Sequence, residues 1–431
     1  MKTQDIINKI NSKEIKIGII GFGYVGMPLG LEFAKNDISI TAFEVDKEKI
    51  KNVNKGISYV IDIKNEELNE YVKKGLIKAT GDFSKLKDMD VIIVCVPTPL
   101  RKSKDPDVSY ILSASYKIKE NLKKGQIIIL ESTTYPGTTR DLVKPILEET
   151  GLKTSKDFYL AFSPERVDPG NKKYGVKNTP KVVGGIDETS GKLAKYIYSL
   201  AVDNVLMVSN AETAEIVKLL ENTFRAVNIA MINEMALMCK RLNLNIWEVI
   251  EAAKTKPFGF MPFYPGPGIG GHCIPLDPHY LGWKMKTLNF EPRFIELAGA
   301  INSSMPEHVI NQLYYIMSEN NKPLKNSKIL VLGIAYKPDI SDPRESPALD
   351  IISLLEKTKA NISYHDPYIS EIEISGKKYH STPLKEIKKY DCVLIITNHS
   401  CIDYEKIAKE AKLILDTRNA IKSKSDKIYK L

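Results

Sequence analysis

Residues 16–44 read KIGIIGFGYVGMPLGLEFAKNDISITAFE, and this stretch decides the fold of the first part of the chain. The apolar run Lys16–Ile20 predicts a short buried strand, and the residues after it predict a helix that continues to about Ala34. A second strand is predicted at Ser39–Phe43 and ends on Glu44. Strand, helix and strand in this order form a βαβ unit, so a parallel α/β sheet is expected.

The loop between the first strand and the helix has the pattern G-x-G-x-x-G, and an acidic residue follows 18 positions after its last glycine. Glycines there permit a tight turn and a close approach to a pyrophosphate, which the positive end of the helix faces. A carboxylate at the end of the second strand accepts hydrogen bonds from ribose hydroxyls and repels a 2′-phosphate, which favours NAD over NADP. The residues expected to contact this cofactor are Gly21, Gly23, Tyr24, Val25, Gly26 and Glu44.

Three further apolar runs predict parallel strands buried on both faces, at Val91–Val96, Gln126–Leu130 and Tyr159–Phe162. Each run ends in a polar turn, and these turns carry Thr98, Thr133 and Glu165. Ligands of open parallel sheets bind beyond the carboxyl ends of the strands, so these side chains are candidates for a site. The commoner role of a threonine at such a position is to cap a helix.

The chain changes to helical spacing from Ala211 to Asn243, and again from about Pro292 to Ser318. Lys218 and Asn222 lie four residues apart and therefore share one face of the first of these helices. A lysine and an amide on one helix face are ordinarily solvated, and the pattern by itself indicates nothing more.

From Lys328 the order strand, turn, helix, strand and acidic residue returns, and it ends at Asp366. The first turn of this copy lacks the second glycine, but it carries Lys337, which can neutralise a phosphate. We therefore expect a second nucleotide-type domain that holds a nucleotide differently or holds the substrate. The predicted architecture is α/β, with two doubly wound Rossmann-like domains (1–208 and 319–431) joined by a helical central domain (209–318).

The stretch Gly266–His279 has four glycines in six residues, and these are followed by Cys273 and Asp277. Glycines allow close backbone approaches, so the stretch can present a reactive thiol to a ligand. Alternatively, it is a surface turn that contains an inert cysteine. A metal site formed with His272 and His279 is not expected, because no usual zinc spacing is present.

Composition excludes several classes of partner. The chain has 431 residues and a net charge of +9, without a basic block interleaved with aromatic residues, so no nucleic-acid partner is expected. No apolar run approaches the roughly 18 residues of a membrane span. The N-terminal sequence lacks the layout of a secretory signal, and the five scattered cysteines include no CxxC pair, which predicts a cytoplasmic protein with free thiols.

Taken together, the motifs resemble the UDP-glucose/UDP-N-acetylhexosamine 6-dehydrogenase family over essentially the whole chain. The resemblance implies an NAD-binding N-terminal domain, a helical middle that forms a homodimer, and a C-terminal domain that holds the UDP moiety of the substrate. The matching stretches are Gly21–Gly26, Pro97–Pro99, Ser132–Thr138, Phe162–Arg166, Lys218–Asn222, Gly266–His279, Gly333–Lys337 and Asp342–Pro347.

The resemblance also implies a reaction, in which the C6 alcohol of a nucleotide sugar becomes a carboxylate through two hydride transfers to NAD. The second hydride must leave a tetrahedral carbon, and addition of the Cys273 thiolate to the aldehyde supplies one as a thiohemiacetal. The second transfer then leaves a thioester on Cys273, which water hydrolyses.

The family's site residues match positions of this chain. Lys218 and Asn222 would stabilise the oxyanion, Asp277 and Thr133 would hold water, and Glu165 would be the general base of hydrolysis or would orient its water. Thr98 and Arg344 would contact the cofactor. The remaining substrate contacts implied are Arg166, Tyr264, Gly268, Gly270, Lys337 and Arg418.

The sugar is indicated by two features. Leu276 stands where the glucose branch has a lysine, and 258–265 is similar to the acetamido-sugar branch. Both features favour an acetamido sugar, and within that branch 97–100 together with 105–110 resemble the UDP-N-acetylglucosamine 6-dehydrogenases. We therefore expect UDP-N-acetylglucosamine, with its epimer UDP-N-acetylmannosamine as the first alternative and UDP-glucose as the second. Two other classes stay open: a single-hydride hydroxyacid dehydrogenase, which needs no thiol, and a nucleotide-sugar-binding protein without activity.

Overall fold

The computed structural model describes residues 3–431 except 61, 102–104, 169, 172 and 272. Contacts within the chain divide it into two compact units. Met1–Glu221 and His279–Leu288 form the first, and Asn222–Pro278 and Asn289–Leu431 form the second. The division falls within one long helix, α8 (Ala211–Arg241), so each unit contains one part of that helix.

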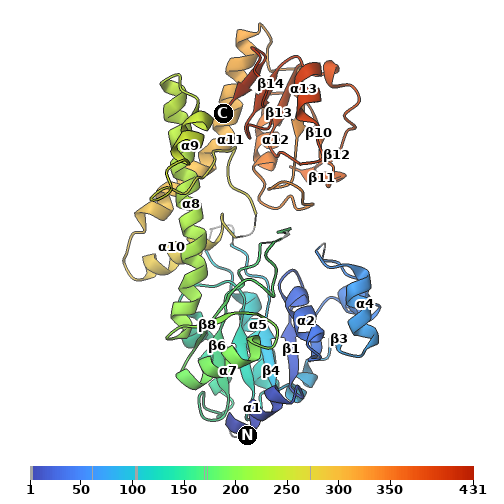
Figure 1. The fold of residues 1–431 in the computed structure, drawn as a ribbon, viewed down its shortest axis with the longest axis vertical. Helices are drawn as coiled ribbons and strands as arrows, with labels where there is room; N and C mark the ends of the chain where they lie inside the picture. The colour runs from blue at the N-terminus through green and yellow to red at the C-terminus, as the bar shows by residue number, and fades with distance from the viewer. Residues whose placement is uncertain (1–2, 61, 102–104, 169, 172, 272) are drawn as a thin grey trace. The chain divides into compact units, whose positions relative to one another are not determined.

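The first unit is built on an eight-stranded sheet in the order β3-β2-β1-β4-β5-β6-β7-β8 (Figure 1). Pairing is parallel from β3 to β6, β7 runs antiparallel to β6, and β8 is parallel to β7. The strands are β1 (Lys16–Ile20), β2 (Ser39–Phe43), β3 (Ile77–Thr80), β4 (Val91–Val94), β5 (Ile127–Leu130), β6 (Tyr159–Phe162), β7 (Lys181–Gly185) and β8 (Val205–Met207).

Helices cover both faces of this sheet. Alternate strand residues belong to separate cores: Ile17 and Ile19 pack with α1, α2, α4 and α7, whereas Ile20 packs with α5 and α6. Burial of both faces is the reason that these strands are continuous apolar runs. The helices are α1 (Thr3–Asn11), α2 (Gly26–Lys35), α3 (Lys47–Asn54), α4 (Asn65–Lys73), α5 (Ser109–Asn121), α6 (Lys144–Glu148) and α7 (Glu188–Tyr198), with short helices η1 (Phe83–Asp88) and η2 (Thr138–Val143).

Four helices make up the helical region of the chain. They are α8, α9 (Ile246–Ala253), α10 (Asp277–Thr287) and α11 (Arg293–Glu319). The α8 and α11 bounds agree with the predicted helical stretches to within two residues. Among the described residues, no helix combines the length and apolar character that crossing a bilayer requires.

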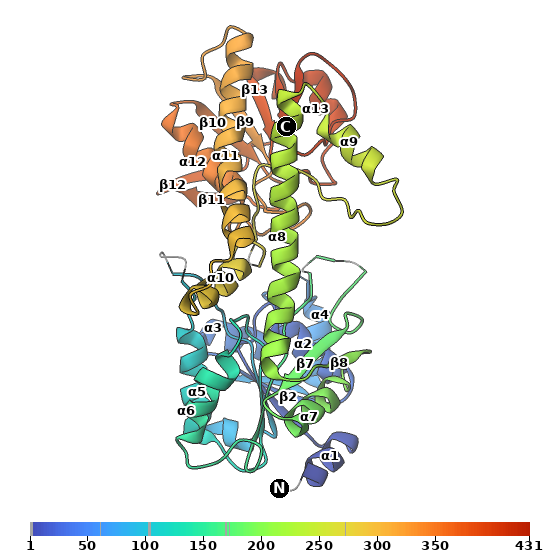
Figure 2. The same cartoon turned by 90° about the vertical axis from the view of Figure 1, so that its left-hand side faces the viewer.

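The second unit carries a five-stranded parallel sheet in the order β10-β9-β13-β14-β15. Helix α11 packs against α12, and both contribute to the core on one face of this sheet (Figure 2). Helix α13 covers the other face. The elements are β9 (Lys328–Leu332), α12 (Pro347–Lys357), β10 (Asn361–His365), β11 (Glu371–Ile374), β12 (Lys377–His380), η3 (Ile387–Lys389), β13 (Cys392–Ile395), α13 (Tyr404–Glu410), β14 (Ile414–Asp416) and β15 (Ile428–Lys430). The predicted fold class is therefore confirmed.

Candidate active site

The three glycines after β1 have different surroundings. Gly21 has φ +85, and a Cβ on it would lie 2.6 Å from the carbonyl oxygen of Cys95. A Cβ on Gly26 would lie 2.2 Å from the carbonyl oxygen of Gly21, whereas a Cβ on Gly23 would meet nothing within 4 Å. The outer glycines thus allow the turn and the close packing of α2, and Gly23 leaves open space beside the N-terminal end of α2. This arrangement fits a dinucleotide pyrophosphate.

Glu44 lies next to this loop, and its carboxylate accepts the N–H groups of Phe22 (3.3 Å) and Val45 (2.9 Å). The side chain is half-buried at the end of β2, at the edge of the sheet where the loop begins. Thr98 follows β4 at the same edge, and its carbonyl oxygen accepts the hydroxyl of Tyr280 (2.7 Å). Tyr24 is half-exposed. The predicted contacts of these residues with the cofactor stay predictions.

Within the first unit, α8 meets the loop that follows β5. The ammonium of Lys218 donates to the hydroxyl of Thr133 at 2.5 Å, and Lys218 is 8% exposed. A nearly buried lysine is not the solvated surface group that helical spacing alone indicates. These two predicted site residues are therefore brought together.

Glu165, in the loop after β6, is held at both carboxylate oxygens. Oε1 accepts the N–H groups of Arg166 (2.8 Å) and Val167 (2.6 Å), and Oε2 accepts from Lys181 (3.2 Å). Burial acts to raise the pKa of this carboxyl, but the Lys181 ammonium, hydrogen bonds and the charge of Lys218 lower the pKa to about 2. Glu165 is therefore ionised at neutral pH, and a carboxylate of such low pKa orients a water better than it removes its proton.

Arg166 is engaged within the protein. Its guanidinium forms an ion pair with Glu221 (2.6 Å) and donates to the carbonyl oxygen of Pro180 (2.7 Å). Its predicted contact with substrate stays a prediction.

In the second unit, the cysteine segment leads directly into α10. The carbonyl oxygen of Cys273 accepts the N–H groups of Leu276 (3.1 Å) and Asp277 (2.8 Å). The Asp277 carboxylate in turn accepts a hydrogen bond from the amide of Asn222, and both side chains are buried. The backbone turn at Cys273 and the buried pair of Asp277 and Asn222 thus belong to one hydrogen-bonded arrangement.

Arg225 belongs to none of the sequence motifs, yet it contacts a predicted site residue. It donates to the side-chain oxygen of Asn222, so it fixes which end of that amide faces Asp277. The signal was present, because residues 218, 222 and 225 follow i, i+4, i+7 spacing along one face of α8.

The glycines of the cysteine segment pack against the second unit's own residues. A Cβ on Gly266 would lie 2.4 Å from the guanidinium of Arg418, and one on Gly271 would lie 2.7 Å from the Tyr336 ring. A Cβ on Gly270 would lie 2.6 Å from the carbonyl oxygen of Glu345. Gly268 has φ +136. Tight packing and backbone geometry therefore account for these glycines without a ligand, and the backbone contact to a sugar stays a prediction.

Buried amides hold the start of the same segment. The N–H of Gly266 donates to Asn233 (2.9 Å), and Asn233 donates to Asn302 on α11 (3.0 Å). Asn302 donates to the carbonyl oxygen of Ala226 (3.0 Å). Both asparagines are nearly or fully buried, so the chain of bonds fixes this segment between α8 and α11.

Asp366 stands where a second dinucleotide site would have the acidic residue that binds the ribose hydroxyls. Its carboxylate, however, is already hydrogen-bonded within the protein. It accepts the N–H groups of Ile334 (2.7 Å) and Ala335 (3.0 Å), and it is 3% exposed. His399 lies 3.0 Å from it through Nε2 and accepts the N–H of Asp339 through Nδ1 (3.0 Å). The buried Asp366 with its His399 partner differs from the half-buried Glu44, and the expectation that the second domain holds a nucleotide differently stays a prediction.

Four other predicted substrate or cofactor residues lie in the second unit. Arg418 donates to the carbonyl oxygen of Ile396 (2.8 Å), and burial lowers the pKa of its guanidinium to about 10, so it stays charged at neutral pH. Arg344 forms an ion pair with Asp342 (2.5 Å). Lys337 lies 6.0 Å from the ring centre of Tyr336, and Tyr264 stacks on Trp247.

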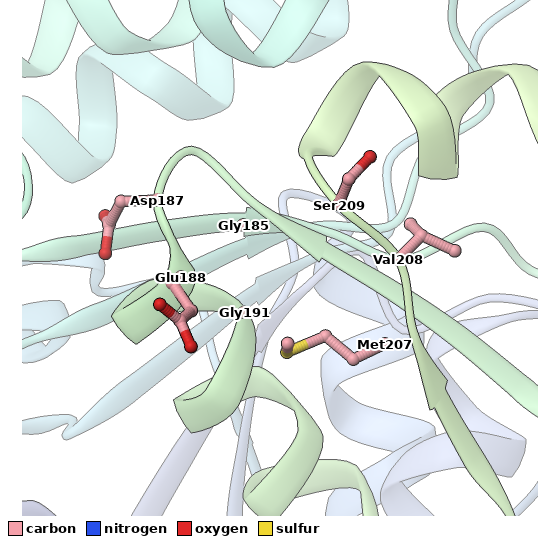
Figure 3. Close-up of a pocket in the computed structure, with 7 residues that line it drawn as sticks. All are labelled: Gly185, Asp187, Glu188, Gly191, Met207, Val208 and Ser209. Atoms are coloured by element: carbon pink, nitrogen blue, oxygen red, sulfur yellow. The ribbon is translucent and has the colours of Figure 1, made fainter.

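A cavity of about 310 Å³ lies at the start of α7 (Figure 3). None of the predicted site residues lines it, and the carboxylate of Asp187 beside it is already used to cap α7 through the N–H of Ser190 (3.0 Å). This cavity is not the candidate site. In the described part of the chain, no three His, Cys, Asp or Glu side chains form a group that could hold a metal, and His272 lies outside that part.

The loop geometry at Gly21–Gly26 and the two Rossmann-type sheets define a dinucleotide-dependent oxidoreductase with a second ligand domain. Models of the UDP-glucose/GDP-mannose dehydrogenase family match residues 15–202 (NAD binding domain), 212–304 (central domain) and 330–423 (UDP binding domain). The chain belongs to this family and is an NAD-dependent nucleotide-sugar dehydrogenase. The predictions of the family and of NAD are thereby confirmed.

Named relatives act on two different sugars. The UDP-N-acetyl-D-mannosamine dehydrogenase of Pyrococcus horikoshii is 34% identical over 95% of this chain and 96% of its own. The UDP-N-acetyl-D-glucosamine 6-dehydrogenase of Salmonella typhi is also 34% identical, over 90% of each chain. A solved structure of the Pyrococcus horikoshii UDP-D-ManNAc dehydrogenase superposes with a TM-score of 0.88 over 96% of this chain and 99% of its own.

Proposed function

We propose that this protein oxidises the C6 hydroxyl of a UDP-N-acetylhexosamine to a carboxylate through a thioester on Cys273. The observation that carries the proposal is the hydrogen-bonded turn in which the carbonyl oxygen of Cys273 accepts the N–H of Asp277, whose carboxylate is held by Asn222. A covalent route through an aldehyde requires a nucleophile, and this turn fixes the backbone of the cysteine that can supply one, four residues before a buried carboxylate held by an amide.

NAD, when bound, would supply the hydride acceptor, with one NAD consumed in each of the two oxidations. Cys273 adds to the aldehyde and later carries the acyl group, while Lys218 and Asn222, one turn apart on α8, donate to the oxygen on C6. Thr133 and Asp277 hold water. Glu165, ionised and fixed by three donors, orients the water that attacks the thioester.

Leu276 and the 258–265 sequence support an acetamido sugar. Within that class we propose UDP-N-acetylglucosamine, supported by the sequence at 97–100 and 105–110 and by relatives named for that substrate. UDP-N-acetylmannosamine is the second candidate, because other relatives of equal identity carry that name. The two sugars differ at C2 alone.

We also propose a homodimer that buries one face of α8. Exposed apolar side chains recur there at spacings of seven, four and three residues, which places them on a single stripe. They are Phe224, Met231, Met235 and Met238. A second copy of the chain is the partner expected, and sedimentation should give twice the chain mass of 48.4 kDa.

We propose the reducing cytoplasm as the location of the protein. The five free cysteines support this location.

The test of substrate is an NADH assay with UDP-N-acetylglucosamine, UDP-N-acetylmannosamine, UDP-N-acetylgalactosamine and UDP-glucose. We expect the highest kcat/KM with UDP-N-acetylglucosamine. Activity with UDP-glucose alone would overturn the acetamido assignment, and one NADH per sugar would indicate the single-hydride class.

A further inference from the structure

Behind Glu165, the first unit buries a cluster of polar side chains that the proposed reaction does not use. Glu131 follows β5, Lys181 opens β7, and Tyr198 ends α7. The three are 1%, 4% and 0% exposed, respectively. Buried charges are costly unless they are paired, so such a cluster requires a reason.

Lys181 links the cluster to Glu165. Its ammonium binds the carboxylate of Glu131 and, at 3.2 Å, the Oε2 of Glu165. The hydroxyl of Tyr198 donates to Glu131 at 2.5 Å, and the ammonium of Lys181 lies 5.1 Å from the centre of the Tyr198 ring. Each member of the cluster thus restrains another, and Glu165 is the member at its edge, with 12% of its side chain exposed.

Two carboxyl groups share the one ammonium of Lys181, and the positive charge of Lys218 acts on Glu165 as well. A proton kept by one of the two carboxyl groups avoids an unpaired negative charge beside Lys181. Glu131 is the carboxyl that keeps the proton more readily, because its side chain is 0% exposed. Glu165, in contrast, accepts two backbone N–H groups that favour its anion. Burial raises the pKa of Glu131 to about 7, despite the opposing charge of Lys181. The thiol of Cys95 also faces Glu131, and burial raises its pKa well above the ordinary range, so it stays neutral.

We infer that Glu131, Lys181 and Tyr198 are positioning residues that keep the Glu165 carboxylate ionised and aimed during hydrolysis of the acyl-enzyme. In that step, water forms a C–O bond to the thioester carbon, the C–S bond breaks, and its electron pair leaves with the sulfur of Cys273. One proton of the water passes to that sulfur and the other to solvent, so a thiol and a carboxylate are left. The inference rests on the proposed function, and it predicts an effect on hydrolysis that exceeds any effect on the two hydride transfers.

The test uses Tyr198→Phe and Glu131→Gln in the full chain, with Tyr196→Phe as the matched control. Tyr196 lies on the same helix and is 49% exposed. Enzyme in excess over UDP-N-acetylglucosamine is mixed with NAD, and NADH formation is followed through one turnover. Acid-quenched samples are analysed by mass spectrometry for the acyl adduct on Cys273.

We expect NADH to form in both variants at close to the wild-type rate. Hydrolysis should slow about tenfold in Tyr198→Phe, and in Glu131→Gln it should slow above about pH 7, where the wild-type carboxyl is ionised and the amide is not, so that the adduct accumulates. Tyr196→Phe should behave as wild type. The ratio of wild-type to Glu131→Gln hydrolysis rates should change with a midpoint near pH 7, because the amide cannot ionise as Glu131 does.

The inference would be overturned if NADH formation and hydrolysis slowed equally and the ratio of wild-type to variant hydrolysis rates did not depend on pH. The cluster would then have a structural role only. If Glu131→Gln does not fold, Tyr198→Phe, which removes a single hydroxyl, still decides between the outcomes. A wild-type protein that gives two NADH and a trappable adduct, with variants indistinguishable from Tyr196→Phe, would overturn this inference alone. Failure of the wild type to give two NADH would overturn the proposed function as well.

Discussion

Lys218 of α8 donates a hydrogen bond of 2.5 Å to the hydroxyl of Thr133, although 85 residues separate them in the sequence. The ammonium is nearly buried, so its burial cost is offset only if its charge is used or paired. This relationship makes Lys218 a preorganised donor instead of a surface group.

Replacing Lys218 with Met should therefore remove transition-state stabilisation while leaving the nucleotide contacts in place. We expect kcat to fall by about 10²- to 10³-fold with a small change in KM. Lys192, exposed on α7, provides the control as Lys192→Met, which should retain full activity. Steady-state kinetics would contradict the assignment if KM rose and kcat did not fall.

Gly23 and Gly26 should respond differently to alanine. Gly23 faces open space, so Gly23→Ala should keep the thermal stability of the protein but weaken NAD binding, since the methyl group would occupy the space for the pyrophosphate. Gly26→Ala would meet the backbone of Gly21 and should lower the melting temperature. Calorimetry of NAD binding together with thermal melts checks both. Unchanged NAD affinity in Gly23→Ala would argue against this position for the cofactor.

Glu215 should make the stability of the protein depend on pH. Its buried carboxyl accepts the N–H groups of Gly137 (2.6 Å) and Thr139 (2.9 Å), and burial raises its pKa from 4.5 to about 7. Because the pKa is higher in the folded state, its stabilisation is fully present below about pH 4.5 and is lost as pH rises through about 7.

The expected loss is on the order of 3 kcal/mol for a shift of this size. Glu215→Gln should flatten the decline in unfolding free energy between pH 5 and 8, measured by denaturant titration at each pH. Glu212→Gln, which is nearer to the surface on the same helix, is the control and should keep the decline. Parallel curves for wild type and Glu215→Gln would contradict the proposed titration.

Asn233→Ala should loosen the cysteine segment. The substitution leaves the N–H of Gly266 without its acceptor and breaks the link to Asn302, which should cost about 1–3 kcal/mol of unfolding free energy. We also expect a higher KM for the UDP-sugar, because the cysteine segment would be held by fewer hydrogen bonds. Asn228→Ala serves as control, because its amide donates to Phe224 at the surface. A loss of stability equal to that of the control would count against the role of Asn233.

The sequence predicts both strands of the first βαβ unit to the residue and the end of its helix to within one residue, because strand, glycine loop and helix each have a local physical cause there. It does not predict that β7 runs antiparallel to β6, because an apolar run buried on both faces carries no sign of its direction. The sequence does not predict the role of Lys181 either. Lys181 looks like an ordinary charge at the start of a strand, because its partner Glu131 lies 50 residues away in the chain.

The glycine-rich segment shows a similar limit. Its glycines indicate that another group lies close to the backbone of the segment, but the sequence does not identify that group. The residues that occupy the space of the missing side chains of Gly266 and Gly271 are Arg418 and Tyr336, which lie more than 60 residues further along the chain. The segment can be located from the sequence, whereas its neighbours require the fold.

The central claim is that Cys273 makes a second hydride transfer possible from the aldehyde. The most direct measurement counts NADH formed per UDP-N-acetylglucosamine consumed, for wild type, Cys273→Ser and the exposed-thiol control Cys401→Ser. We predict two NADH per sugar and an acyl adduct on Cys273 for wild type and for Cys401→Ser, and loss of both for Cys273→Ser. Two NADH per sugar at an undiminished rate from Cys273→Ser would contradict the account.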